Sequence, residues 1–298
     1  MLKKMLVGIV FGSMLVNGLY YDSYQKESEV VEASSKTIVQ DPVKTVEKEP
    51  AKTVAPTKKV STTAVTTVSK TEKPKAKNTL SSVPKKYSYD NKKMVYLTFD
   101  DGPNRYTPEL LNVLKRQKVR ATFFVTGPNA KANPSIIRRM VKEGHTVGLH
   151  SMTHNKNIFY RSPQIAVKEM KAVQSIVYKA SGRKSITMRV PYGTVPYFTK
   201  PYLDASKKAG FRTWDWNVDS NDWRYPRSRT ASHDIIMAGV RHTDLKNVAS
   251  IILMHDHATT GASLEKTIIS LKQKGKHFGT VGTVKKPYTF RVSVWKKQ

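Results

Sequence analysis

From residue 94 onward, the chain alternates short apolar runs with longer segments whose apolar residues recur at helical spacing. The runs are rich in β-branched and aromatic residues, as strands are. Seven of them follow one another over about 190 residues, an alternation typical of β/α units with parallel strands. The strand-like runs are 94–99, 121–126, 145–150, 186–190, 211–218, 249–255 and 277–281.

Several segments between these runs carry the capping signals of helices. Ser, Thr or Pro stands at the start of several of them and Gly at the end. With seven strands, the alternation favours an α/β fold in the form of a distorted (β/α) barrel, closed or nearly closed, over a doubly wound sheet. We find no GxGxxG or Walker-type loop that would favour a nucleotide-binding fold. The expected helices are 107–117, 134–144, 163–182, 199–210 and 263–275.

Residues 1–21 have the composition of an export signal. Two lysines precede about fifteen mostly apolar residues, the order typical of a secretory signal peptide. Small residues allow cleavage after Gly18, but residues 5–21 also lie near the lower length limit for crossing a bilayer. A cleaved signal and a membrane anchor both stay open. Either one predicts an exported protein at the cell surface or in the cell wall.

Residues 22–90 have little periodicity and are rich in Lys, Thr, Val, Ser, Glu and Pro. Such a segment buries too little apolar surface to offset chain entropy, so we expect a disordered tether. A coil of about 65 residues spans roughly 45 Å, which would carry a folded domain from a membrane into the wall. We therefore divide the chain into residues 1–21, a linker at 22–90 and a folded domain at 91–298.

The folded domain is strongly basic. Of the chain's 52 basic and 22 acidic residues, 37 and 13 lie in residues 91–298, a net charge of +24. The basic residues are scattered rather than gathered in a nucleic-acid motif, so anionic wall polymers fit an exported protein better than nucleic acid does. Cysteine is absent, which excludes disulfides and thiolate chemistry and leaves only His and carboxylates to hold any metal.

Acidic residues are scarce in this domain except where the expected strands end. In a parallel barrel these C-terminal strand ends converge on one rim, where chemistry collects. Five of the domain's 13 acidic residues lie there, which predicts a functional site at that rim. The strand-end residues are Asp100, Asp101, His150, His154, Arg189, Asp219, Asp222, His255 and Asp256.

Two pairs of residues that lie close together in the sequence, His150 with His154 and Asp100 with Asp101, predict a metal site. The four-residue separation in 150-HSMTH-154 lets two imidazoles face one ion. An Asp from another strand end would complete two nitrogens and one oxygen, the ligand set of an open catalytic site. One of the adjacent Asp100 and Asp101 could bind the ion while the other accepts a proton, and the cation would relieve their repulsion. The alternative is an Asp-Gly turn whose acids only cap the next helix.

Five ordered motifs between about residues 94 and 281 resemble those of the polysaccharide deacetylases, carbohydrate esterase family four. The resemblance implies a distorted (β/α) barrel, in agreement with the strand count. It also implies that residues 91–298 are a metal-dependent catalytic domain that removes acetyl groups from a glycan. The motifs are 98-TFDDGP-103, 150-HSMTH-154, 189-RVPYG-193, 219-DSNDW-223 and 253-LMHD-256.

The resemblance implies a role for each matched residue on the metal side of the site. Asp101, His150 and His154 correspond to the metal ligands, with Zn²⁺ expected first and Co²⁺, Ni²⁺ or Mn²⁺ as alternatives. Asp100 corresponds to the general base that activates water. Arg189 corresponds to the arginine that orients this base and keeps it ionised.

On the other side of the site, His255 resembles the general acid that protonates the departing amine, and Asp222 resembles the acid that tunes it. The backbone N–H of Tyr192 would help to hold the oxyanion. These roles match what amide hydrolysis requires: an activated water, charge stabilisation and a proton for the amine. The residues expected to contact substrate are Leu253, Trp223 and Pro191.

Export, the tether and the basic surface favour peptidoglycan as the substrate, with N-acetylglucosamine as the first expectation for the sugar. N-acetylmuramic acid, chitin oligomers, an exopolysaccharide and an O-acetylated xylan stay open, as does a catalytically silent wall-anchoring module. We expect a monomer. The segment 224–247 is hard to assign, and we interpret its His233 and His242 as surface residues. Asp215 and Asp219 have no assigned role, and residues 282–298 either form a final strand or trail from the domain.

Overall fold

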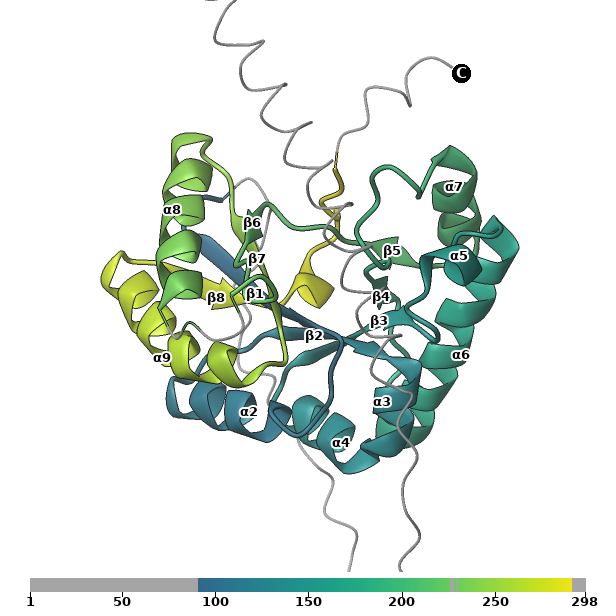
Figure 1. The fold of residues 1–298 in the computed structure, drawn as a ribbon, viewed down its shortest axis with the longest axis horizontal. Helices are drawn as coiled ribbons and strands as arrows, with labels where there is room; N and C mark the ends of the chain where they lie inside the picture. Colours follow the sequence, from purple (N-terminus) through teal and green to yellow (C-terminus); the bar gives the residue numbers. More distant parts are fainter. Residues whose placement is uncertain (1–90, 226–227, 229, 291–298) are drawn as a thin grey trace, which may run out of the picture. The chain divides into compact units, whose positions relative to one another are not determined.

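The computed structural model describes residues 91–225, 228 and 230–290. The expected leader at 1–21 and the whole linker expected at 22–90 lie outside these ranges, so the proposed division of the chain stays a prediction. Within the described ranges, a central parallel sheet is surrounded by helices, which confirms the expected α/β class (Figure 1).

The sheet is curled into a distorted, incomplete barrel. In the described part of the chain its strands run in the order β5-β4-β3-β2-β1-β7-β6, β8 pairs with β1, and every pairing is parallel. The pairings recorded there leave β5 and β6 as the two edges, so the barrel is open between them. The strands are β1 (Met94–Asp100), β2 (Thr122–Thr126), β3 (Thr146–Ser151), β4 (Thr187–Met188), β5 (Arg212–Thr213), β6 (Val218–Asp219), β7 (Ser250–His255) and β8 (His277–Gly279).

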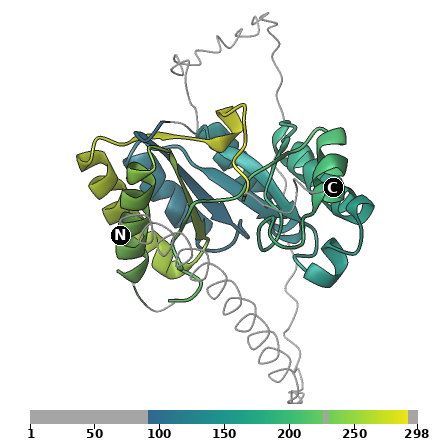
Figure 2. The ribbon, with the colours of Figure 1, turned by 90° about the horizontal axis from the view of Figure 1, so that it is seen from above.

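Helices cover the outside of this sheet (Figures 1 and 2). Neighbouring helices touch in the order α8, α9, α2, α4, α6 and α7, which makes an outer layer that follows the curl of the sheet. The helices are α2 (Thr107–Arg116), α3 (Gly127–Ala132), α4 (Pro134–Lys142), α5 (Lys156–Phe159), α6 (Pro163–Ser181), α7 (Lys200–Lys208), α8 (Ala231–Leu245) and α9 (Ala258–Gln273), with a 3₁₀ turn η1 at Val281–Thr283.

All of strand β1 is buried, because helices cover one face of it and the barrel interior the other. Its alternate residues divide between two apolar clusters, as the two-residue period of a strand requires. Val95, Leu97 and Phe99 join the large cluster beneath the helices, whereas Met94 and Tyr96 join a smaller one that contains Trp214. Asp100 continues the Met94–Tyr96 series, so the strand pattern itself directs its carboxylate toward the barrel interior.

Most of the expected elements are confirmed within a few residues, but the run 211–218 is wrong as a single strand. It forms β5 and β6, separated by residues 214–217. The ladder is interrupted because the Asp215 N–H bonds to the Tyr288 carbonyl, and the Asp215 carboxylate accepts bonds from Thr194 and Phe290. These are partners far away in the sequence, which local patterns do not reveal.

The segment 224–247 contains helix α8, which the sequence analysis left unassigned. The interpretation of His233 as a surface residue is wrong: its side chain is buried between α8 and α9, with Nδ1 3.0 Å from Thr267 Oγ1. His242 is exposed, as expected. Helices α3 and α5 were not expected, and α9 begins at Ala258 rather than at residue 263.

Residues 284–290 form neither a final strand nor a free tail. They follow η1 and hydrogen-bond to Asp215 through Tyr288 and Phe290. Residues 291–298 lie outside the described ranges. Among the described helices, none has both the length and the apolar character that a bilayer crossing demands.

Candidate active site

The strand-end residues singled out from the sequence converge on the C-terminal rim of the sheet. Asp100 ends β1 and pairs in register with His255 at the end of β7. Asp101 follows β1, and His150 lies near the end of β3. Because parallel strands finish at one edge, residues more than 150 positions apart in the chain become neighbours there.

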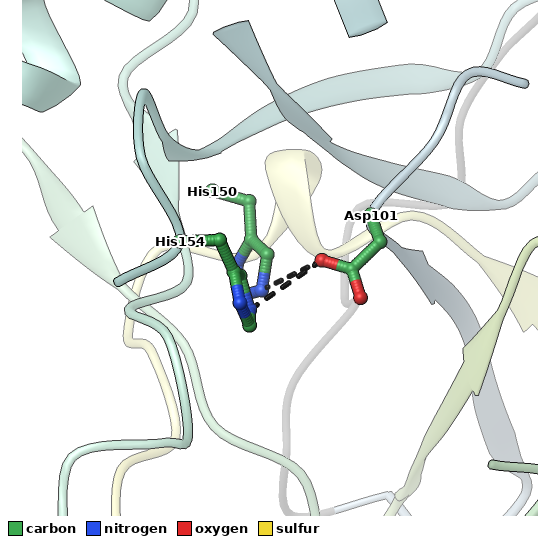
Figure 3. Close-up of side chains that lie close together, drawn as sticks. All are labelled: Asp101, His150 and His154. Carbon is green, nitrogen blue, oxygen red and sulfur yellow. Dashed lines mark ion pairs between the residues drawn. The ribbon is translucent and has the colours of Figure 1, made fainter. Parts of the chain in front are cut away.

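Asp101, His150 and His154 face one another (Figure 3). Asp101 Oδ1 lies 3.5 Å from His150 Nε2 and 3.5 Å from His154 Nε2. One ligand atom from each residue lies within 4.8 Å of the others. His150 is buried, whereas Asp101 and His154 are partly exposed, so the cluster opens toward solvent on one side.

Local backbone geometry holds two of these three residues, Asp101 and His154, in place. Asp101 and His154 both adopt left-handed backbone angles, with φ of 70° and 48°. The Asp101 carbonyl accepts a hydrogen bond from Asn129 Nδ2 at 2.6 Å, and the His154 N–H donates to Ser151 Oγ at 3.0 Å. Such angles are uncommon outside glycine and persist where surrounding contacts enforce them.

The cluster fits a divalent cation. Among the described residues, Asp101 Oδ1 is buried and has no hydrogen-bond partner, although it faces two imidazole nitrogens. Ligands bound about 2.1 Å from one tetrahedral ion lie about 3.4 Å apart, close to the observed separations. Two imidazoles and a carboxylate form a donor set suited to zinc and neighbouring transition metals.

Neighbouring charges and burial have opposite effects on the pKa values of Asp101 and His154. Burial raises the pKa of Asp101, but four neighbouring imidazoles, with His150 and His154 having the largest effects, together outweigh it and leave the pKa below its ordinary value. Burial lowers the pKa of His154, against the opposing effect of Asp101. A deprotonated carboxylate and a neutral imidazole are the forms that bind a metal.

Beside this cluster, Asp100 is held by Arg189. Asp100 Oδ1 accepts a hydrogen bond from Arg189 Nη1 at 2.9 Å, and both residues are buried. Asp100 Oδ2 lies 3.8 Å from His150 Nε2. The guanidinium also donates to Thr98 Oγ1 at 2.8 Å and lies 4.3 Å from the centre of the Phe124 ring. A buried charge-assisted hydrogen bond of this kind is shorter and stronger than a neutral one, so it fixes the orientation of the carboxylate.

On the opposite side of the rim, His255 pairs with Asp222. His255 Nδ1 lies 2.8 Å from Asp222 Oδ1, and the His255 N–H donates to Asp222 Oδ2 at 2.7 Å. Thr260 Oγ1 donates to the same carboxylate at 2.9 Å. Although burial lowers it, the Asp222 carboxylate raises the pKa of His255 to about 10. The imidazole is therefore protonated at neutral pH, and its Nε2–H is available as a donor.

The loop after Arg189 brings Tyr192 to the cluster of Asp101, His150 and His154. The Tyr192 ring packs against the His154 ring with centroids 5.1 Å apart, and its hydroxyl donates to the His154 carbonyl at 3.2 Å. Pro191 is buried, and its carbonyl accepts a bond from the Tyr160 hydroxyl at 2.6 Å. The Tyr192 backbone is left-handed, with φ of 64°.

The residues expected to contact an acetyl methyl lie beside the acid pair. Leu253 is buried in β7 and pairs in register with Asp219 of β6. The Trp223 N–H donates to Asp222 Oδ1 at 2.9 Å, and its side chain is half-buried. Burial raises the pKa of Asp219 to about 6.

The sequence analysis missed Glu169 of α6, which anchors the loop carrying His154. Its Oε2 accepts hydrogen bonds from the N–H groups of Met152 and Thr153 at 2.9 and 3.0 Å. The sequence contained an indication of this role, because Glu169 lies on the apolar stripe of its helix, between Ala166 and Val173. A carboxylate at such a position requires a specific partner.

Asp256 is a further buried carboxylate of the rim. It accepts a hydrogen bond from Thr107 Oγ1, and its carbonyl accepts one from Asn104 Nδ2 at 2.9 Å. Burial raises the pKa of Asp256 to about 7. The contacts connect the end of β7 to the start of α2, which agrees with a structural role at the junction.

Comparison with known proteins points to one family. A family model described as polysaccharide deacetylase matches residues 88–214. Peptidoglycan-N-acetylglucosamine deacetylase of Bacillus cereus is 38% identical over 198 residues, which cover 66% of this chain and 72% of that protein. The crystal structure of the polysaccharide deacetylase Bc1974 from Bacillus cereus is 37% identical with a TM-score of 0.56, covering 68% of this chain and 98% of that chain.

A third similar protein is BA3943 of Bacillus anthracis, described as a pseudoenzyme of carbohydrate esterase family four. Its crystal structure is 27% identical with a TM-score of 0.57, and covers 64% of this chain and 65% of that chain. The fold alone therefore does not guarantee turnover, and activity depends on the residues of the site.

Proposed function

We propose that this chain, which belongs to the polysaccharide deacetylase family, removes the N-acetyl group of N-acetylglucosamine in peptidoglycan by metal-dependent hydrolysis. The single observation that carries the proposal is the convergence of three groups on one rim. These are the Asp101, His150 and His154 cluster, the buried Asp100–Arg189 pair and the Asp222–His255 pair.

Asp101, His150 and His154 would hold the cation, which when bound lowers the pKa of water and polarises the acetyl carbonyl. Asp100 lies beside this cluster and, oriented by Arg189, accepts the proton of the attacking water. The Tyr192 N–H donates a hydrogen bond to the carbonyl oxygen as negative charge develops on it.

The amine leaves badly as an anion, so the reaction also needs a proton donor. His255 meets this need, because Asp222 holds its Nδ1 and keeps the ring protonated at neutral pH. The proton passes from Nε2 to the amine nitrogen as the carbon–nitrogen bond breaks. Leu253 and Trp223, next to the acid pair, would line the pocket for the methyl group, and Pro191, beside Tyr192 in the chain, would contact the substrate from that loop.

The choice of substrate rests on the relatives and on the chain's overall character. A relative at 38% identity acts, by its name, on N-acetylglucosamine of peptidoglycan. An apolar leader, a polar linker and a basic domain also suit an exported, monomeric protein held at the wall by anionic polymers. N-acetylmuramic acid, chitin oligomers and exopolysaccharide are the alternative substrates.

The test is release of acetate by the full chain, after loading with Zn²⁺ or Co²⁺, from peptidoglycan and from chitin oligomers. We expect acetate from peptidoglycan, and mass spectrometry of the digested glycan should locate the free amine on the glucosamine residue. Asp100→Asn should lower kcat by about 10²- to 10⁴-fold while the metal stays bound. His242→Gln, at an exposed position of α8, serves as the matched control.

If the metal-loaded protein released no acetate from any acetylated glycan, the silent wall-anchoring module would replace the enzyme. The presence of a pseudoenzyme among the similar structures gives that alternative a specific basis. Acetate released only from chitin oligomers would keep the chemistry and overturn the proposed substrate.

A further inference from the structure

Asp215 is a buried carboxylate to which the proposed mechanism gives no role. Its side chain is fully buried and accepts three hydrogen bonds. Thr194 donates its N–H at 3.0 Å and its hydroxyl at 2.5 Å, and the Phe290 N–H donates at 2.7 Å. Burying a carboxylate is costly unless it is well hydrogen-bonded, so this arrangement fixes Thr194 and Phe290, which supply the three donor groups, in place.

The backbone around Asp215 cradles the arginine of the catalytic base. The Asp215 carbonyl accepts a hydrogen bond from Arg189 Nη2 at 3.1 Å, and the Trp214 carbonyl accepts one from Arg189 Nε at 3.3 Å. The Trp216 ring lies 5.4 Å from the guanidinium. Since Arg189 Nη1 holds Asp100, the position of this segment sets the position of the base.

The same carboxylate fastens the loop that carries the expected oxyanion donor. Tyr192 and Gly193 are both left-handed, with φ of 64° and 79°. The Tyr160 hydroxyl holds one side of this loop through the Pro191 and Gly193 carbonyls. Asp215 holds the other side through Thr194. A left-handed backbone at a tyrosine costs on the order of 1 kcal/mol or more, so it persists only under such constraint.

Asp215 also joins both features to the C-terminal segment, residues 284–290. Its N–H donates to the Tyr288 carbonyl at 2.9 Å, and its carboxylate accepts from the Phe290 N–H. The Phe290 ring packs edge-on against Trp216, with centroids 5.1 Å apart. The segment therefore supports the residues that separate β5 from β6, where the barrel is open.

We propose that Asp215 is a positioning residue of the deacetylation reaction, acting through Arg189 and the Tyr192 loop, and that docking of residues 284–290 is required for full turnover. The inference rests on the proposed function. It makes the residues of the rim depend on residues 284–290, which lie outside the five sequence motifs.

The first test is Asp215→Asn in the full chain. The amide has one oxygen acceptor for three donors, and its NH₂ group faces an N–H. We expect the Tyr192 loop to shift and kcat per metal-loaded site to fall by about 10- to 100-fold, since the loss of one oxyanion donor costs about 10²- to 10³-fold. KM and the dissociation constant for Zn²⁺ should change by less than about twofold, because the affected contacts strengthen only in the transition state.

A merely structural role would have a different signature. It would lower the melting temperature and the number of metal-loaded sites and leave kcat per site unchanged, and that result overturns the proposal. Thr194→Val and Thr194→Ser form a milder matched pair if Asp215→Asn folds poorly. Valine removes the hydroxyl donor to Asp215 and serine keeps it, so kcat should fall in the first variant only.

The second test is a pair of truncations. A chain ending at residue 286 lacks the Tyr288 and Phe290 contacts, and we expect its kcat to fall as in Asp215→Asn. A chain ending at residue 290 keeps both contacts and should turn over like the full chain. Equal turnover of the two truncations contradicts the inference. The proposed function is judged separately, by whether the unaltered chain releases acetate.

Discussion

Two histidines five positions apart on the β3 segment have opposite environments. His145 precedes β3 at the N-terminal edge of the sheet. Its Nδ1 accepts the Ala121 N–H at 3.1 Å, and its ring packs edge-on against Phe123 at 5.5 Å. His150, near the other end, directs Nε2 toward two carboxylates at 3.5 and 3.8 Å. One imidazole packs in the core, and the other faces the expected ligand cluster.

The difference teaches that position in the fold, not residue type, decides what these histidines do. At the N-terminal edge, the backbone satisfies Nδ1 and Phe123 packs against the ring, whereas Nε2 is buried without a hydrogen-bond partner among the described residues and lies 3.8 Å from one Glu143 carboxylate oxygen. At the C-terminal rim, Asp101 Oδ1 is buried without a hydrogen-bond partner among the described residues, beside two imidazoles. Such an arrangement is unfavourable on its own and becomes favourable when a cation joins the three groups.

The largest expected effect comes from removing the rim histidine. His150→Ala deletes a ligand, and we expect metal content to fall below about half of the sites and kcat to fall by more than about 10³-fold. Metal analysis of the purified protein and acetate release measure the two quantities. If the His150→Ala protein kept both its metal content and its activity, His150 would not be a functional ligand, and the comparison with His145 would fail.

A smaller loss of activity should follow a change on the acid side of the rim. Asp222→Asn removes the charge that raises the pKa of His255, so a smaller fraction of the ring is protonated at neutral pH. We expect kcat to fall by about 10²-fold with metal content unchanged. NMR titration of His255 in the metal-loaded protein would report the lowered pKa directly. If the variant lost metal together with activity, the Asp222–His255 pair would be needed for metal binding as well as for proton donation.

The contrast between the edges also explains what could be predicted from the sequence. Strand ends and acidic residues are local features, so the rim residues and the parallel α/β class followed from patterns alone. The strand-like run 94–99 and its partner 249–255 match β1 and β7 almost residue for residue. The expected ligand set also assembles, because strand register fixes where Asp101 and His150 lie.

Features that depend on distant partners were not predictable in this way. The break between β5 and β6 requires Asp215 to meet Thr194 and Phe290, and no local pattern encodes those contacts. Glu169 was overlooked although its place on an apolar stripe was visible. His233 was assigned to the surface because the helix that buries it, α8, was not recognised.

The smallest effect on activity, and a distinct one on stability, is expected at the other end of β3. Burial is the main cause that lowers the pKa of His145 to about 4, with Arg139 and Arg120 acting in the same direction and Glu143, 3.8 Å away, opposing them. The unfolded chain takes up a proton near pH 6.5 and the folded chain only near pH 4. The contribution of His145 to the free energy of unfolding is therefore fully present above pH 6.5, and about 3 kcal/mol of stability is lost as the pH drops to 4.

His145→Asn keeps an acceptor for the Ala121 N–H but cannot titrate. The variant loses the edge contact with Phe123 and should be somewhat less stable at pH 7. Denaturant unfolding gives the free energy of unfolding at pH 7 and at pH 4. Between these two pH values the variant should lose about 3 kcal/mol less than the unaltered chain, because the other groups titrate alike in both proteins. Acetate release at pH 7 should be unchanged. An equal pH dependence in the two proteins would mean that folding does not lower the pKa of His145, and the two ends of β3 would then differ less than the packing indicates.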